Sequence, residues 1–175
     1  RGDGLTGLDV GTGTGVVALS LLKEGPFSRV VATDDSPQAL TLALENAGDH
    51  HLTDSVEFRE GTLFEPLRGE ERFDVIVSNP PYIAEEDRES LQPEVLDWEP
   101  HGALFAGPEG LDILLPLVEG APRFLNPGGL FAAEIGEGQG ERMVTALEGT
   151  GAFQTISVRP DLAGRERVIL GVASS

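Results

Sequence analysis

The chain contains no cysteine, and only one lysine, one tyrosine and one tryptophan among its 175 residues. Without cysteine, disulfide bonds and thiolate metal sites are excluded. No apolar run approaches the roughly 20 residues of a membrane-spanning helix, and no signal-peptide pattern is present, so we expect a cytoplasmic protein without membrane association. The three histidines, His50, His51 and His101, lack the spacing of metal ligands, and we predict no metal site.

Basic residues are also scarce, since 12 of them face 30 acidic residues and the formal net charge is -18. Such a charge opposes sequence-independent binding to a phosphate backbone, which depends on the release of counterions. We therefore expect no stable complex with nucleic acid. An acidic, lysine-poor surface is typical of a high-salt cytoplasm, while GC-rich coding depletes lysine as well, and the sequence leaves both explanations open.

Short apolar runs alternate with amphipathic segments along the whole chain, without a repeat or a long linker. This rhythm predicts one α/β domain over residues 1–175, with a mostly parallel seven-stranded sheet, helices on both faces and an antiparallel C-terminal strand. The expected strands cover residues 5–10, 29–34, 56–60, 73–78, 129–135, 153–159 and 167–172. The expected helices cover residues 13–22, 37–46, 111–124 and 139–148. Ligands in such sheets bind beyond the carboxyl ends of the strands.

A glycine-rich turn, Gly11-Thr12-Gly13-Thr14-Gly15, joins the first expected strand to the first expected helix. Glycines lack a Cβ atom and let a ligand approach the backbone and the helix N-terminus. The spacing differs from the Gly-x-Gly-x-x-Gly of dinucleotide-binding proteins, which disfavours a nicotinamide cofactor. Asp9, just before this turn, either orients it or binds an amino group of the ligand.

Asp34 ends the second expected strand, where a carboxylate can accept hydrogen bonds from both hydroxyls of a ribose. Asp35 is the alternative, because strand alternation is expected to direct only one of the two side chains into the crevice. Capping of the next helix is a competing role for either residue, and Ser36 competes for it.

The segment Ser78-Asn79-Pro80-Pro81-Tyr82 follows the fourth expected strand. Its two prolines remove two backbone donors and fix φ, so the turn is stiff and exposes carbonyl acceptors beside the Asn79 amide. The nitrogen of an amide or an exocyclic amine is a poor nucleophile, and acceptors aligned with its two N–H bonds would hold it in position. We therefore predict Asn79, Pro80, Pro81 and Tyr82 as catalytic residues, with the Tyr82 ring against the planar group. The alternative is a rigid strand terminator without chemistry.

The glycine turn together with Asp34 resembles the S-adenosylmethionine-dependent methyltransferases, and their Asn-Pro-Pro-Tyr segment serves glutamine side chains as well as nucleobases. From residue 8 to residue 171, the chain is similar to the protein-(glutamine-N5) methyltransferases that modify peptide chain release factors. Further motifs that carry this similarity are Leu63-Phe64-Glu65-Pro66-Leu67, Pro93-Glu94-Val95, Trp98-Glu99-Pro100, Gly110-Leu111-Asp112, Pro127-Gly128-Gly129, Glu134-Ile135-Gly136 with Gln139, and Asp161-Leu162-Ala163-Gly164-Arg165.

The resemblance implies a Rossmann-like class I methyltransferase fold that binds S-adenosylmethionine. It implies that residues 11–15 hold the methionine and ribose portions, Asp34 the ribose hydroxyls, and Thr62 with Leu63 the adenine. Asn79 would border both cofactor and substrate, and the substrate would be the glutamine of a Gly-Gly-Gln loop in a release factor. Three features depart from the family. Thr62 stands where an aspartate is usual, residues 111–115 lack an aromatic-basic pair that is often found there, and we expect the N-terminal helical docking domain to be absent.

Two alternatives stay open at this point. Methylation of an exocyclic amino group of a nucleobase in DNA or ribosomal RNA would need a basic face or a recognition insert, and residues 83–110 are too short and too acidic for one. A non-catalytic cofactor-binding module would bind the cofactor without depending on Asn79. Trp98 is expected to pack the long loop over the site, and Arg165 and Arg167 are expected to pair with acidic residues rather than act in chemistry.

Overall fold

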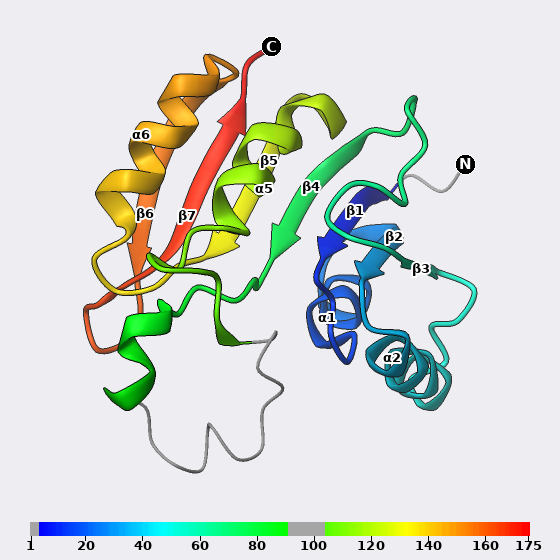
Figure 1. Cartoon of the computed structure of the whole chain (residues 1–175). Coiled ribbons are helices and arrows are strands. Elements are labelled where there is room, and N and C mark those ends of the chain that lie inside the picture. The colour runs from blue at the N-terminus through cyan, green and yellow to red at the C-terminus, as the bar shows by residue number, and fades with distance from the viewer. Residues whose placement is uncertain (1–3, 91–103) are drawn as a thin grey trace.

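The computed structural model describes residues 4–90 and 104–175, drawn in colour in Figure 1. The strands are β1 (Leu5–Val10), β2 (Phe27–Asp34), β3 (Val56–Glu60), β4 (Phe73–Ser78), β5 (Leu125–Glu134), β6 (Phe153–Pro160) and β7 (Glu166–Ala173). The helices are α1 (Val16–Glu24), α2 (Pro37–Asp49), α5 (Leu114–Gly120) and α6 (Gly140–Thr150), with 3-10 helices η1 (Glu85–Ser90) and η2 (Ala121–Phe124). The expectations for the Pro93 motif, Trp98 and His101 lie outside the described residues.

The seven strands form one sheet in the order β3-β2-β1-β4-β5-β7-β6. Neighbouring strands from β3 to β5 pair in parallel, whereas β7 is antiparallel to both β5 and β6. Because chain order reverses on either side of β1, the gap between β1 and β4 is a topological switch point, where ligands of such sheets bind. The predicted fold class is confirmed, including the antiparallel C-terminal strand.

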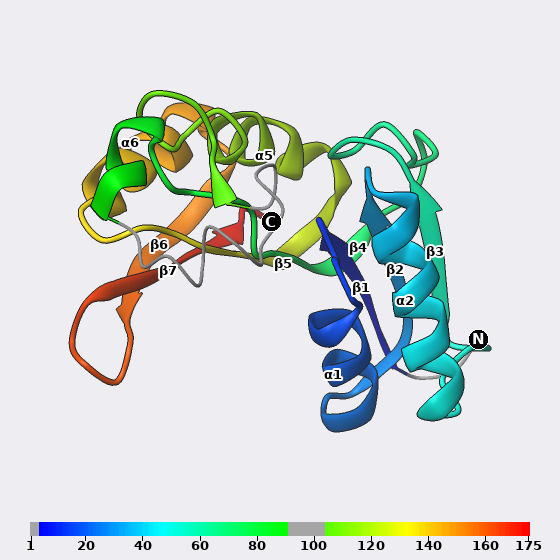
Figure 2. The same cartoon turned by 60° about the horizontal axis from the view of Figure 1, so that its bottom comes forward.

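Helices cover both faces of the sheet. Figure 2 shows α1 and α2 on one face of the half that contains β1 to β3, and α5 and α6 on the other face of the half that contains β5 to β7. The burial of β2 explains this arrangement, since Val30 and Ala32 pack with α1 and α2 while Val31 between them packs in the cluster of α5 and α6. A strand buried on both faces needs a continuous apolar run, which the sequence supplies here.

All four helices differ from their predicted bounds, α2 and α6 only by one to three residues at their ends. α1 begins at Val16 instead of residue 13, because Gly11, Gly13 and Gly15 have φ angles of 70°, 55° and 83°, which an α-helix cannot include. The predicted helix over residues 111–124 is divided into α5 and η2. Pro122 lies in the first turn of η2, where its missing N–H costs nothing, and it cannot continue the hydrogen bonding of α5.

No helix in the described ranges is long and apolar enough to cross a membrane.

Candidate functional site

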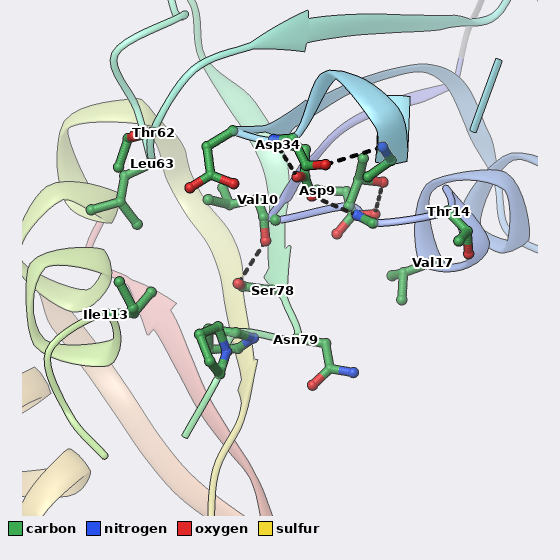
Figure 3. A pocket seen from close by; sticks show the side chains of 18 of the residues that line it. Asp9, Val10, Thr14, Val17, Asp34, Thr62, Leu63, Ser78, Asn79 and Ile113 are labelled. Carbon is green, nitrogen blue, oxygen red and sulfur yellow. Dashed lines mark hydrogen bonds between the residues drawn. The ribbon is translucent and has the colours of Figure 1, made fainter. Parts of the chain in front are cut away.

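A cavity of about 750 Å³ opens at the carboxyl ends of β1, β2 and β4, at the switch point of the sheet (Figure 3). Nine of the ten residues predicted to bind the cofactor line it, namely Asp9, Gly11, Thr12, Gly13, Thr14, Asp34, Thr62, Leu63 and Asn79. Pro80 and Pro81 also line it, whereas Gly15 and Tyr82 are not among its lining residues. Asp9 and Asn79, which are 70 positions apart in the chain, thus meet at one site.

The three glycines of the first turn have two different functions. An added Cβ atom at Gly11 or Gly13 would meet no protein atom within 4 Å, so both leave open space beside the cavity. Gly15 is instead the N-cap of α1, and its Cβ would lie 3.2 Å from Cβ of Ala43, so this glycine allows close packing of α1 against α2. The left-handed φ at each position favours glycine.

Asp9 ties the glycine turn to the start of α1. Its side chain is 1% exposed, and its Oδ2 accepts hydrogen bonds from Thr12 Oγ1 at 2.6 Å and from the Ala18 backbone N–H at 3.0 Å. Burial, which outweighs these hydrogen bonds, raises the pKa of the Asp9 carboxyl to about 6. Within the described chain Oδ1 accepts no hydrogen bond, so this oxygen is available to an amino group in the cavity.

Asp34 lies between the glycine turn and α2 (Figure 3). Its Oδ2 accepts a hydrogen bond from the Gly13 N–H at 2.7 Å, and its Oδ1 accepts one from the Ser36 N–H at 2.9 Å. Each carboxylate oxygen has a second lone pair for a ligand hydroxyl. The cap of α2 is Ser36, whose Oγ accepts a hydrogen bond from the Ala39 N–H at 3.2 Å.

The prediction that only one of the two neighbouring aspartate side chains points into the crevice stays a prediction. Asp34 and Asp35 both line the cavity. β2 ends at Asp34, and strand alternation therefore no longer determines the direction of the Asp35 side chain.

The opposite side of the cavity, away from Thr14 and Val17, is formed by Thr62, Leu63 and Ile113 (Figure 3). Leu63 has a left-handed φ of 50°, which is uncommon for a residue with a side chain. Sequence reasoning missed the role of Ile113, which directly precedes α5. The one signal for it was its position next to the Gly110-Leu111-Asp112 motif.

Asn79 lies at the edge of the cavity with an exposed side chain (Figure 3). In the described part of the chain, neither its side-chain amide nor the Pro80 carbonyl has a hydrogen-bond partner. Ser78, just before it, is buried and donates from Oγ to the Val10 carbonyl at 2.7 Å, which ties the end of β4 to β1. The segment therefore has two unpaired acceptors beside the cavity, one on the exposed Asn79 side chain and one on the backbone of the buried Pro80.

Tyr82 follows the cavity-lining residues Pro80 and Pro81 but does not line the cavity itself, and hydrogen bonds hold its side chain. Its hydroxyl donates to Glu134 Oε1 at 2.8 Å and accepts from Arg167 Nη1 at 3.1 Å. Burial, reinforced by the Glu134 carboxylate, raises the pKa of the Tyr82 hydroxyl. Contact of its ring with an acceptor group stays a prediction.

The two C-terminal arginines pair with acidic residues, as predicted. Arg165 Nε lies 3.1 Å from Asp161 Oδ2, and Arg167 lies 3.8 Å from both Glu134 and Asp161. Arg167 is thereby part of the support of Tyr82, a role the sequence did not indicate.

The electrostatics of the cavity favour a cation. Its described lining includes the carboxylates of Asp9, Asp34 and Asp35 and no basic side chain. S-adenosylmethionine carries a positive sulfonium and an ammonium group together with ribose hydroxyls, and the cavity volume is within the range of ligand sites. The residues present therefore fit this cofactor. No group of three or more His, Asp or Glu residues in the described ranges is arranged to hold a metal ion.

Solved structures confirm the fold. A ribosomal protein L11 methylase from Lactobacillus delbrueckii matches all of this chain and 72% of its own, with a TM-score of 0.68 and 24% identity. A methyltransferase from Pyrococcus furiosus matches 98% of this chain and 76% of its own, with a TM-score of 0.69 and 20% identity.

Curated relatives found by sequence have higher sequence identity to this chain than these two solved structures. A release factor glutamine methyltransferase from Geobacter sulfurreducens is 45% identical over 164 residues, which cover 94% of this chain and 56% of that protein. One from Xylella fastidiosa is 47% identical over 163 residues, which cover 93% of this chain and 58% of that protein. The chain thus spans just over half the length of these curated relatives.

The family model for the methyltransferase small domain matches residues 3–96, more than half of the chain, and this range includes β1 to β4 with the glycine turn, Asp34 and Asn79. On this match, supported by the position and chemistry of the cavity, the chain belongs to the methyltransferase small domain family.

Proposed function

We propose that residues 1–175 form an S-adenosylmethionine-dependent methyltransferase domain acting in the cytoplasm on a peptide chain release factor. The methyl acceptor is the side-chain amide nitrogen of the glutamine in its Gly-Gly-Gln motif. One observation carries this proposal. Two hydrogen-bond acceptors, Asn79 Oδ1 and the Pro80 carbonyl, have no partner in the described chain and belong to residues that line a cavity that fits the cofactor. The names of relatives 45–47% identical to the chain support the choice of substrate.

When bound, the cofactor supplies an electrophilic methyl group on a positively charged sulfur. Asn79 Oδ1 and the Pro80 carbonyl accept hydrogen bonds from the two N–H bonds of the glutamine amide and direct its nitrogen toward that methyl group. Transfer of this methyl group would form one N–C bond and break one S–C bond, and the nitrogen would then lose a proton to water. Positioning is the main contribution of the protein, because the amide nitrogen is a weak nucleophile.

Asp9 and Asp34 contribute by placing the cofactor. Asp34 receives the ribose hydroxyls, and Asp9 Oδ1 receives the ammonium group. Thr62, Leu63 and Ile113 form the adenine end, where Thr62 provides a hydroxyl in place of the carboxylate usual in the family.

The test is transfer of labelled methyl to a purified release factor, in a Gly-Gly-Gln and a Gly-Gly-Ala form, with duplex DNA as a third acceptor. We expect label on the Gly-Gly-Gln form alone. Asn79→Ala should lower the rate by about 100-fold or more, because one of two aligned acceptors is lost. Asn126→Ala is the matched control, since the Asn126 amide binds Asp74 and neither residue lines the cavity.

Cofactor affinity, measured by calorimetry for each variant, separates binding from transfer. Label on DNA would show that the methyl acceptor is a nucleobase and not the release factor. Bound cofactor with no label on any acceptor would contradict the proposed activity for this chain, and full activity of Asn79→Ala would contradict the proposed role of Asn79.

A further inference from the structure

Gln139, the N-cap residue of α6, connects three separate turns through its side chain. Nε2 donates to the Tyr82 carbonyl at 3.0 Å and approaches the Glu109 and Gly110 carbonyls at 3.3 and 3.4 Å. Oε1 accepts a hydrogen bond from the Gly136 N–H at 2.8 Å. Both N–H bonds of the amide are thus directed at backbone carbonyls, and its oxygen is paired as well.

The residue that Gln139 holds is the last one of the acceptor segment. Gln139 binds the Tyr82 carbonyl, while Glu134 and Arg167 bind the Tyr82 hydroxyl. At the other end of the segment, the Ser78 hydroxyl is bound to the Val10 carbonyl. Hydrogen bonds therefore fix the segment at both ends, before and after Asn79, Pro80 and Pro81.

The two prolines make the conformation of this segment depend on how its two ends are held. Because φ is fixed at Pro80 and Pro81, few rotations remain between Ser78 and Tyr82. The direction of the Pro80 carbonyl then depends on where the Tyr82 backbone is held. A shift of Tyr82 would turn this carbonyl away from the glutamine amide, although Tyr82 itself does not line the cavity.

Two glycines make room for the contact between Gln139 and Tyr82. A Cβ atom at Gly110 would lie 2.1 Å from the Tyr82 carbonyl oxygen and 2.9 Å from Gln139 Nε2. A Cβ atom at Gly136 would lie 3.1 Å from Gln139 Oε1 and 3.3 Å from Tyr82 Cδ2. The absence of side chains at Gly110 and Gly136 thus leaves room for the Gln139 side-chain amide. A side chain directed into solvent would not need this space.

We propose that Gln139 is a positioning residue of the acceptor site, which holds the Tyr82 backbone and thereby directs the Pro80 carbonyl and the Asn79 amide at the substrate nitrogen. This inference rests on the proposed function. It assigns Gln139 an effect on the rate of transfer and none on cofactor affinity, because the Gln139 side chain does not line the cofactor cavity.

The kinetic test uses Gln139→Glu, which keeps an acceptor for the Gly136 N–H and turns an oxygen toward the Tyr82 carbonyl. We expect kcat to fall by about 100-fold at saturating cofactor, with the cofactor Kd unchanged. Because a protonated carboxyl can donate again, the ratio of variant to wild-type kcat should recover as pH falls. Arg142→Ala is the matched control, since Arg142 joins α6 to Glu109 through an exposed ion pair, and it should keep wild-type kcat.

A second measurement does not depend on activity. Tyr82 is the only tyrosine of the chain, so tyrosine labelled with 13C at the carbonyl gives one protein carbonyl resonance to follow. We expect this resonance to move upfield in Gln139→Ala and Gln139→Glu, because the carbonyl loses its donor, and to stay in place in Arg142→Ala.

The outcomes separate the two proposals. An unmoved resonance would overturn the contact, and a moved resonance with unchanged kcat would overturn the positioning role. Loss of kcat accompanied by an equal loss of cofactor affinity would also overturn it, because the effect would then be general. A wild-type chain that transfers no methyl would overturn the proposed function and the positioning role together, while the resonance would still report whether Gln139 holds Tyr82.

Discussion

Asp9 combines a structural role with a proposed binding role in a single carboxylate. One oxygen joins Thr12 to the first turn of α1, and the other borders the cavity without a partner in the described chain. Burying such a carboxylate is costly, and its pKa of about 6 records this cost. The residue is therefore expected to favour ligand binding at the expense of stability.

Asp9→Asn should stabilise the folded protein at neutral pH. The pKa of Asp9 is raised from 3.8 to about 6, so the unfavourable contribution of its charge is absent at low pH, grows as pH rises through this interval and is complete above it. Two pKa units correspond to about 3 kcal/mol. This is an upper value, because a neutral amide oxygen accepts the hydrogen bonds from Thr12 and Ala18 more weakly than the carboxylate does.

Urea unfolding at pH 4 and pH 7.5 measures this difference, and calorimetry measures cofactor affinity. The stability gain of Asp9→Asn should be larger at pH 7.5, while its affinity for S-adenosylmethionine should decrease. A gain that is equal at both pH values would show that the charge of Asp9 is not the cause.

At the scale of elements, the β1-turn-α1 unit places the cofactor site. β1 ends at Val10, two backbone N–H groups of the turn donate to the Thr33 carbonyl, and α1 starts only after three left-handed glycines. This unit connects the ends of β1 and β2 and leaves space for a ligand between them. Gly15 has the additional task of admitting Ala43 of α2.

Gly15→Ala should therefore destabilise the protein by about 1–2 kcal/mol, from the left-handed conformation of residue 15, with a further contribution from the 3.2 Å contact to Ala43. Gly149→Ala is the matched control. Gly149 lies within α6, and an added Cβ there would meet no atom within 4 Å. This control should instead stabilise the protein by about 0.5–1 kcal/mol.

Denaturant unfolding measures the free energy of unfolding of Gly15→Ala and of Gly149→Ala. Equal m-values would be evidence of a common unfolded state. Equal effects of the two substitutions would refute the assigned role of Gly15.

For the whole molecule, the net charge of -18 is the dominant property. Ion pairs offset part of it, as at the edge of the sheet, where Arg59 Nη1 lies 2.7 Å from Glu71 Oε2 and lowers the pKa of Glu71 to about 2. Because only 12 basic residues face 30 acidic ones, most of the negative charge is not compensated. Mutual repulsion is thus expected to weaken the folded state.

Sodium chloride should consequently stabilise the protein. Raising the salt from 0.1 to 1 M shortens the Debye length from about 10 Å to about 3 Å and screens repulsion between distant acidic groups. We expect a higher midpoint of thermal unfolding in 1 M NaCl, and a smaller increase at pH 4, where carboxylates begin to be protonated. A midpoint that falls with salt would show that the ion pairs outweigh the repulsion.

Much of the fold was determined by the sequence alone. β1, β3 and β4 have the predicted bounds, because apolar runs mark the strands and glycine or Asn-Pro-Pro ends them locally. The glycine turn, Asp34 and Asn79 line the cavity because parallel strands bring their carboxyl ends to one edge. These features depend on neighbours in the chain or on the rule of sheet topology.

The tertiary structure alone decided the rest. Arg167 reaches the Tyr82 hydroxyl across 85 positions of the chain, and Gln139 reaches the Tyr82 carbonyl across 57. Ile113 lines the cavity, and Asp35 joins Asp34 there. Periodicity and capping patterns report on neighbours within a few residues, whereas these contacts follow from the packing of β5, β7 and α6 against the acceptor segment. The sequence thus determined most of the predicted residues that line the cavity, and the packing decided which residues contact Tyr82 at the end of the acceptor segment.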